Sequence, residues 1–445
     1  MSSDLNGWFT IRFFHHGAGK DRLMRDALMP ALAGLRAGGQ VRAAFLQRHW
    51  LRGPHVQVNV QLAAPDALPG VTEALRTAGL DWWAAHGPLE DLPADEYLRR
   101  FASVGQAELV TEPLLPLVPG GTVTTGPLRM REEMFGGPSG AATARAFWND
   151  TQDVLRAALD PRAQQEGRVP TFLRWAFTFA HAFEGLGEEA FCSVPSVGLT
   201  FKSHAEAYFF NGNESLRAPF EHKRLQAAGL IERLYLEARE PDRELRQLRA
   251  AFRDAYGRIM EDLAAQTLRL PTTLEYHEME GEDARPLTET LSSWHAGLAD
   301  PDSDLSRLSR EPEIVARRLI VNLMYQQMIT AGGRALDRLF VCHVASRTIE
   351  DAFRDQAWTA PRPRPVTPSA CAGGDTVTLL PASAAFHAQS SYSPLRPPSI
   401  PPVAPPVTSE SAGWRLPPGH LPAQSLAGAL TGRRSSRAFT GAPLT

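Results

Sequence analysis

Cationic and imidazole side chains gather at two places in the first half of the chain. Arg48 and His55 flank the dipeptide Gly53-Pro54, and Lys202 and His204 stand in the segment Lys-Ser-His-Ala-Glu. An imidazole can take a proton from carbon, and ammonium or guanidinium groups can hold the anion that then leaves. Charge of that kind is stabilised without a metal ion or a covalent nucleophile. The residue types therefore suit acid–base chemistry on a substrate that carries or releases an anionic group.

Each place also has a structural interpretation. Gly53-Pro54 predicts a tight turn that brings two strands side by side, and a hairpin with a polar outer face would carry Arg48 and His55 equally well. Lys202 and His204 share one side of an extended segment, which is also consistent with a surface strand. His15, His16 and His49 have no Cys, Asp or Glu ligand at matching spacing, so no metal site is expected.

The composition limits the classes of function. The 445 residues carry a net charge of −3, so the overall charge of the chain does not favour binding to nucleic acid. Three cysteines stand in no pair spacing, which favours a reducing compartment over a disulfide framework. The N-terminal residues lack the core of a signal peptide, and no apolar run is long enough for a membrane span. We expect a cytoplasmic protein with no membrane contact.

Periodicity predicts an α+β fold that opens strand-helix-strand, with a mixed or antiparallel sheet and a large helical part. Strands are expected at 8–14 and within 45–62, where Val56, Val58 and Val60 alternate with Gln57 and Asn59. Helices are expected over 21–35, 142–159, 171–186, 230–239, 242–268 and 313–353, and a strand and turn over 195–210. The span 1–357 is read as one folded domain of two packed lobes.

The composition changes after residue 357. Of the 36 prolines, 15 lie between Pro361 and Pro422. Proline removes amide donors and fixes φ, so residues 358–424 are predicted to form an extended linker. A short piece from 425 to 445 follows it.

Four segments in the folded part resemble one family. They are WFTIRFFHHGAGKDRLMRDALMPALAGL, FLQRHWLRGPHVQVNV, REEMFGGPSG with the helix after it, and LTFKSHAEAYF, and they span most of residues 7–350. Together they resemble the elimination domain of lanthipeptide dehydratases and of related thiopeptide enzymes. The resemblance implies that glutamate is eliminated from a glutamylated serine of a precursor peptide, leaving dehydroalanine. It implies a separate tRNA-dependent glutamyl transferase as partner and no cofactor.

The resemblance also implies roles for individual residues. The expected catalytic set is His204, Lys202, Arg48 and His55, and the expected substrate contacts are Gln57, Asn59, Ser203 and Asn322. Two departures stand out. The family usually carries two arginines at the positions of Gln57 and Asn59. Its late helix often carries a histidine, and near that position this chain has only Asn322.

Two other functions stay open, and the missing arginines favour the first of them. A related pyridine synthase joins two dehydroalanines by a formal cycloaddition and expels the leader peptide, so it has no glutamate to bind. A non-catalytic scaffold that docks the leader peptide is the third possibility.

The segment SLAGALTGRRSSRAFTGAPLT at 425–445 resembles the start of the nitroreductase-like azoline dehydrogenases. In that family the residues matching Arg433, Arg434, Ser435 and Arg437 contact the FMN phosphate, which arginine forks suit. Only about 20 residues of that domain are present, so FMN is expected only with the rest of it. A fusion of this kind resembles the bifunctional proteins of lactazole-like thiopeptide clusters.

Overall fold

The computed structural model describes residues 7–87, 92–107, 110, 112–270, 293–300 and 302–353. The proline-rich linker at 358–424 and the tail at 425–445, with Arg433, Arg434, Ser435 and Arg437, lie outside the described residues. Within the described part, no helix is both long enough and apolar enough to cross a membrane.

The chain begins with an antiparallel sheet of four strands in the order β2-β3-β1-β4. The strands are β1 (Trp8–Phe14), β2 (Val41–His49), β3 (His55–Leu62) and β4 (Val123–Pro127). The predicted hairpin is confirmed, because β2 and β3 pair in antiparallel fashion across Gly53-Pro54. Arg52 and Gly53 both have positive φ in that turn, at 60° and 122°. The sequence analysis did not predict β4.

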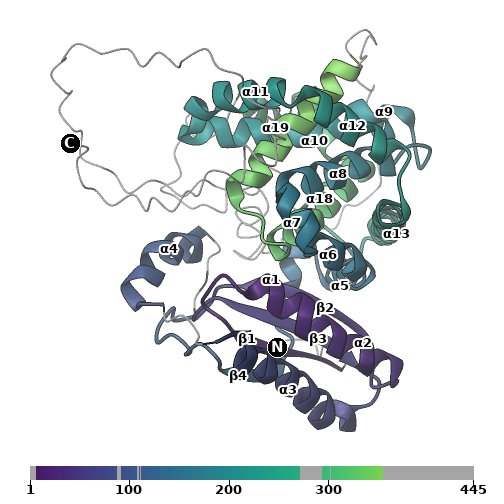
Figure 1. Ribbon diagram of the computed structural model, residues 1–445. Helices are drawn as coiled ribbons and strands as arrows, with labels where there is room; N and C mark the ends of the chain where they lie inside the picture. Colours follow the sequence, from purple (N-terminus) through teal and green to yellow (C-terminus); the bar gives the residue numbers. More distant parts are fainter. Residues whose placement is uncertain are drawn as a thin grey trace, which may run out of the picture.

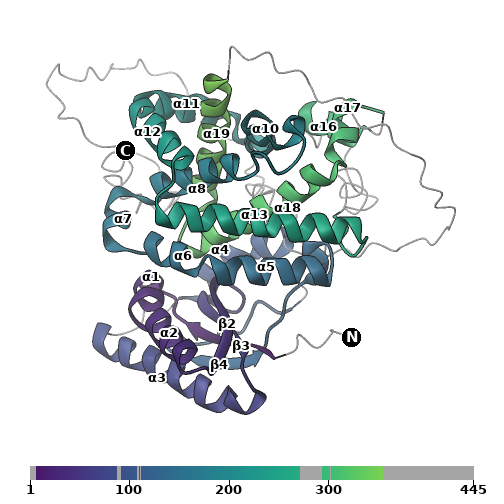
Figure 2. The same ribbon diagram turned by 90° about the vertical axis from the view of Figure 1, so that its right-hand side faces the viewer.

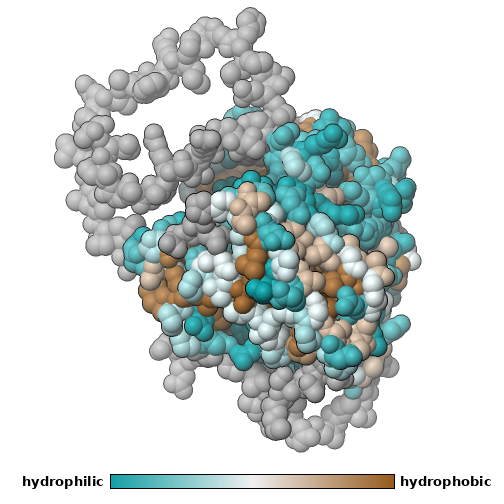
Figure 3. Space-filling model, turned by 60° about the horizontal axis from the view of Figure 1, so that its bottom comes forward, coloured by the Kyte–Doolittle hydropathy of each residue, from teal (hydrophilic) through white to brown (hydrophobic). Residues whose placement is uncertain are grey.

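One face of the sheet is apolar and is covered by helices, in the lower part of Figure 1. These are α1 (Lys20–Leu23), the π-helix Met24–Leu28, α2 (Met29–Ala37) and α3 (Leu68–His86). Gly79 of α3 lies so close to Phe13 that a Cβ atom there would be 2.6 Å from the ring, so only glycine allows this approach. Seen from the α3 side, apolar residues are scattered among polar ones (Figure 3).

Helices form a second layer above the sheet (Figures 1 and 2). They are α5 (Pro138–Asp150), α6 (Gln152–Ala158), α7 (Pro161–Glu166), α8 (Arg168–Ala182), α9 (Glu189–Cys192), α10 (Val194–Tyr208), α11 (Arg217–Gln226), α12 (Ala228–Arg239), α13 (Arg243–Ala264), α16 (Ser293–Ala299), α17 (Asp304–Ser309), α18 (Pro312–Thr330) and α19 (Ala335–Ala352). Helix α4 (Ala94–Ala107) lies to one side of the sheet in Figure 1. The α+β prediction is therefore confirmed.

The strand and turn predicted over 195–210 are wrong, because this segment is the helix α10. Its buried residues Val197, Phe201, Ala205 and Tyr208 recur every three to four positions, which is a helical stripe. Pro195 occupies the first turn, where its missing amide costs nothing. The β-branched and aromatic residues in this stretch made it resemble a strand.

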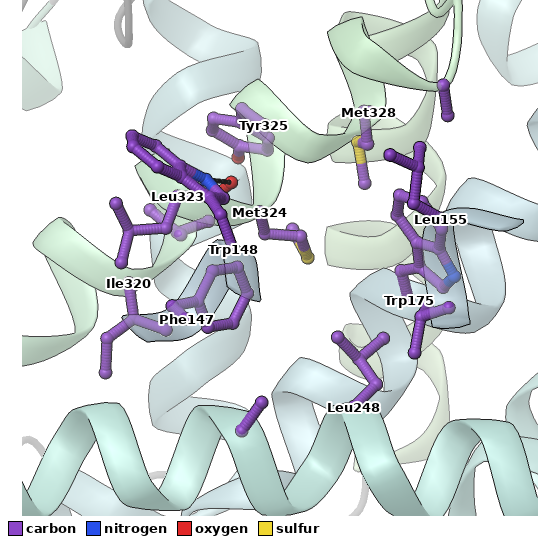
Figure 4. Packing of buried hydrophobic residues seen from close by; sticks show 14 of the residues in the cluster. Phe147, Trp148, Leu155, Trp175, Leu248, Ile320, Leu323, Met324, Tyr325 and Met328 are labelled. Carbon is purple, nitrogen blue, oxygen red and sulfur yellow. Dashed lines mark hydrogen bonds between the residues drawn. The ribbon is translucent and has the colours of Figure 1, made fainter. Parts of the chain in front are cut away.

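The two layers share one continuous core. Trp8 of β1 and Phe45 of β2 contact each other with ring centroids 5.5 Å apart, and Phe45 lies 5.3 Å from Trp148 of α5. Trp148 donates a hydrogen bond to the carbonyl of Leu323 in α18 (Figure 4). These aromatic residues bury the half of the sheet that faces the helices near α5.

A buried carboxylate joins the layers on the other side. Asp21 of α1 accepts hydrogen bonds from Arg48 of β2 and, at 2.6 Å, from Arg168 of α8. Arg48 also donates to the carbonyl of Thr330 at the end of α18, at 2.8 Å, and Arg168 donates to that of Ala331. One carboxylate thus fixes the sheet, α8 and α18 together.

We predict that Asp21→Asn lowers the free energy of unfolding by about 3 kcal/mol, because it leaves two guanidinium groups without their counter-charge at a site where the carboxylate is 9% exposed. Urea unfolding followed by tryptophan fluorescence measures the change. Glu73→Gln, which breaks an exposed pair with Arg76, is the control and should leave the unfolding midpoint unchanged. Equal midpoints for the two variants would contradict the structural role of Asp21.

Candidate functional site

The second face of the sheet is polar and forms the first of two polar clusters. In the register, Thr10 of β1 stands opposite Asn59 of β3, and Arg12 stands opposite Gln57. Thr10 donates a 2.7 Å hydrogen bond to the Asn59 side chain, which is fully buried. Gln57 is partly buried on the same face. We call these residues, with His49 and His55, the sheet cluster.

Two imidazoles lie side by side at the turn end of this cluster. His49 of β2 pairs with His55 of β3, and their rings are 5.3 Å apart. His55 Nδ1 donates to the Gly53 carbonyl at 2.7 Å, so its Nε2 accepts from Gln57 at 3.2 Å. Burial lowers the pKa of His49 to about 4 and that of His55 well below its usual range. Both imidazoles are therefore neutral at physiological pH.

Arg48 does not belong to the sheet cluster. Neighbouring residues of a strand point to opposite faces, and Arg48 lies between Gln47 and His49 in β2. Its guanidinium reaches the apolar face and binds Asp21. The expectation that Arg48 and His55 point into one pocket is wrong, although the turn does bring their strands together.

The second polar cluster lies among the helices and contains His204 of α10. His204 Nδ1 donates to the Thr200 carbonyl at 2.8 Å, and the hydroxyl oxygen of Tyr325 in α18 lies 3.4 Å from the same nitrogen. Tyr325 is 3.1 Å from the Cys342 sulfur, and the Arg338 guanidinium stacks 4.9 Å above its ring. We call this group the helix cluster.

The hydrogen bond to Thr200 places the proton of neutral His204 on Nδ1, so the lone pair is on Nε2. Burial, followed by the charges of Arg338, His295 and Arg318, lowers the pKa of His204 to about 3. The ring therefore remains an unprotonated base over the whole physiological range. Neighbouring cations favour any negative charge that develops beside it.

Lys202 does not accompany His204. Two residues apart on a helix is about 200°, so the side chains leave α10 on opposite sides. Lys202 forms a 2.7 Å ion pair with Glu350 of α19 and is 40% exposed. Ser203 contacts Nε2 of His295 in α16 at 3.1 Å. The expectation that Lys202 and His204 share one face depended on the incorrect strand.

Asn322 lies on α18, which carries Tyr325 of the helix cluster and ends against β2. It is 8% exposed, and its side-chain oxygen is buried without a hydrogen bond. At 100° per residue it belongs to the stripe of Arg318, Tyr325, Gln326 and Ile329. Tyr325 belongs to the helix cluster, and the end of α18 binds β2 through Thr330.

The four residues predicted to be catalytic are therefore not gathered in one pocket. His55 lies in the sheet cluster and His204 in the helix cluster, while Arg48 and Lys202 are held in ion pairs elsewhere. The sequence analysis missed Arg12, Tyr325 and Arg338. The alternation of β1 was the only available signal for Arg12, and nothing local marked the other two.

Other possible sites are limited. The described residues contain no group of three or more His, Cys, Asp or Glu side chains placed to hold a metal ion. A surface recess of about 320 Å³ is lined by Arg36, Asn149, Asp150, Gln152, Asp153, Gln247, Ala250, Ala251 and Asp254. None of the predicted site residues lines it.

Comparisons place the fold among known proteins. The family model described as lantibiotic biosynthesis dehydratase C-terminal matches residues 8–349. The chain is similar to the pyridine synthase TbtD from thiomuracin biosynthesis, with a TM-score of 0.57 and 20% identity over 78% of this chain and 99% of that one. It is also similar to TsrL, with a TM-score of 0.56 and 15% identity over 78% and 95% of the two chains. No curated protein sequence matches.

We predict that protonation of His204 contributes to acid destabilisation. Its pKa is about 3 in the folded protein against an ordinary 6.5, so the unfolded chain binds more protons below pH 6.5. The contribution to stability is complete above pH 6.5 and is lost as the pH falls toward 3. Urea unfolding midpoints between pH 4 and 7 should depend less on pH for His204→Gln than for the wild type. Identical slopes would contradict the lowered pKa.

Proposed function

The chain belongs to the family of lantibiotic biosynthesis dehydratase C-terminal domains, and on that premise we propose that it eliminates glutamate from glutamylated serines of a precursor peptide. The product is dehydroalanine. The family acts on precursor peptides of ribosomal origin. The proposal further places the protein in thiopeptide biosynthesis, in the cytoplasm, beside a separate glutamyl transferase that supplies the ester.

The reaction needs a base and a leaving group. A base takes the α-proton of the esterified serine, the C–H electron pair becomes the new double bond, and the Cβ–O pair leaves with the glutamate carboxylate. Hydroxide leaves poorly, whereas a carboxylate leaves readily, so prior glutamylation makes the step feasible. Fixed cations and hydrogen-bond donors then stabilise the enolate-like transition state.

His204 is the observation that carries the proposal. Its Nδ1 proton is held by Thr200, which leaves Nε2 as an unprotonated acceptor. Arg338 and Arg318 act on it electrostatically, and negative charge on the bound substrate offsets them and favours proton uptake in the transition state. In this proposal Ser203 and Asn322 contact the peptide, Ser203 as the neighbour of His204 on α10 and Asn322 on α18, which also carries Tyr325.

A second candidate is a pyridine synthase, which acts on dehydroalanines instead of making them. Two observations favour it. The sheet positions 57 and 59 hold neutral amides, and Asn59 is already engaged by Thr10 and by Gln47. The fold is also similar to that of the pyridine synthase TbtD over nearly the whole of that protein.

One mass-spectrometric assay separates the candidates. The protein is incubated with a glutamylated precursor peptide and, separately, with a fully dehydrated one. The proposal requires loss of glutamate from the first substrate. Cyclisation with loss of the leader from the second indicates the synthase, and binding without any mass change indicates a scaffold.

We predict that His204→Ala leaves the glutamylated peptide to accumulate, with elimination slower by ~10²–10⁴-fold, because general base catalysis is lost. Peptide affinity, measured by fluorescence anisotropy, should remain close to that of the wild type. Lys202→Ala is the matched control on the same helix, since its side chain points away toward Glu350, and it should retain activity. Full activity of His204→Ala would remove the assigned role.

A further inference from the structure

Arg12 of β1 is a partly buried cation on the polar face of the sheet. It makes no hydrogen bond and no ion pair with any residue in the described ranges, and burial followed by the charge of Arg129 lowers its pKa. Three other partly buried arginines have acidic partners. Arg48 and Arg168 share Asp21, and Arg224 binds both Glu221 and Asp351.

Arg12 is partly exposed on the polar face of the sheet. It lies on the polar face opposite Gln57 of β3 and Thr124 of β4. A Cβ atom at Gly126 of β4 would be in ordinary van der Waals contact with one guanidinium nitrogen, at 3.5 Å. Thr125 of the same edge strand is exposed.

Positive charge predominates around Arg12, and the acid Glu112 acts on the nearby His49. Arg129 is exposed just after β4 and repels Arg12. The neutral imidazoles of His49 and His55 lie within electrostatic range and are themselves kept unprotonated in part by Arg12. Keeping two guanidinium groups together costs free energy, and such a cost is usually retained where an anion binds.

We propose that Arg12, with Arg129 beside it, is a binding site for a carboxylate of the peptide substrate. A guanidinium fork matches a carboxylate in shape and charge, and a bound anion would relieve the repulsion between the two arginines. The inference rests on the proposed function only in taking the ligand to be a substrate of that reaction. The carboxylate is that of the glutamyl group or that of an acidic side chain in the peptide.

Binding is tested first without catalysis. Glutarate, used as the probe, should raise the thermal midpoint of the wild-type full chain but not that of Arg12→Gln. Arg12→Gln itself should melt at the wild-type temperature or above it, because an unpaired cation is removed. A lower melting temperature together with an unchanged response to glutarate would mean that Arg12 is structural, and would overturn the proposal.

Elimination assays then identify the source of the carboxylate. Arg12→Gln should lower kcat/KM on the glutamylated peptide on the order of 10- to 100-fold, and Arg12→Lys should recover part of it. If a glutaminyl ester is a poor substrate for the wild type and this preference disappears in Arg12→Gln, the glutamyl group is the ligand. If replacing an acidic residue of the peptide reproduces the loss instead, that side chain is the ligand.

Two outcomes contradict the site. The carboxylate role is excluded if Arg12→Gln has wild-type activity. It is also excluded if the variant loses activity but the wild type loses none on the glutaminyl ester or on the peptide whose acidic residue is replaced. Arg76→Gln on α3, across the sheet, is the control and should match the wild type in both assays. If the wild type eliminates nothing but still responds to glutarate through Arg12, the proposed function fails while the anion site stands.

Discussion

The structure depends on one carboxylate, that of Asp21, which neutralises two arginines where the sheet meets the helices. Because Arg48 and Arg168 also bind the last carbonyls of α18, the ion cluster fixes the end of that helix against β2. α18 carries Tyr325 and Asn322, so this constraint determines where the helix cluster stands relative to the sheet. Arg48, which the sequence analysis expected to be catalytic, therefore helps to position Tyr325 and Asn322.

The two polar clusters have one physical property in common. In each, burial keeps imidazoles neutral while guanidinium groups act on them from nearby. Neutral bases beside fixed positive charge suit a reaction in which a proton leaves carbon and an anion departs. The same environment opposes folding at low pH, because the unfolded chain takes up protons that the folded chain excludes.

Two features of the sheet separate its structural and polar faces. Alternation along β2 sends Arg48 to the apolar side and His49 to the polar side. Alternation along β1 sends Arg12 to the polar side, where no acid in the described part of the chain pairs with it. The apolar face is closed by helices, with Gly79 against Phe13. Trp148 covers one end of the polar face. Arg12, His49 and His55 lie at the other end, near the turn between β2 and β3.

The sequence by itself determined the α+β class, the hairpin around Gly53-Pro54 and the family, because strand alternation, turn residues and ordered motifs are local patterns. It also identified His204, Asn322 and the polar positions of β3 as notable. Only the tertiary structure decided which of the charged side chains form ion pairs inside the protein. Arg48 and Arg12 are both arginines on strands, and what distinguishes them is Asp21, a partner brought from another element by folding. Long-range pairing of this kind, like the helical state of α10, has no signature in the local sequence.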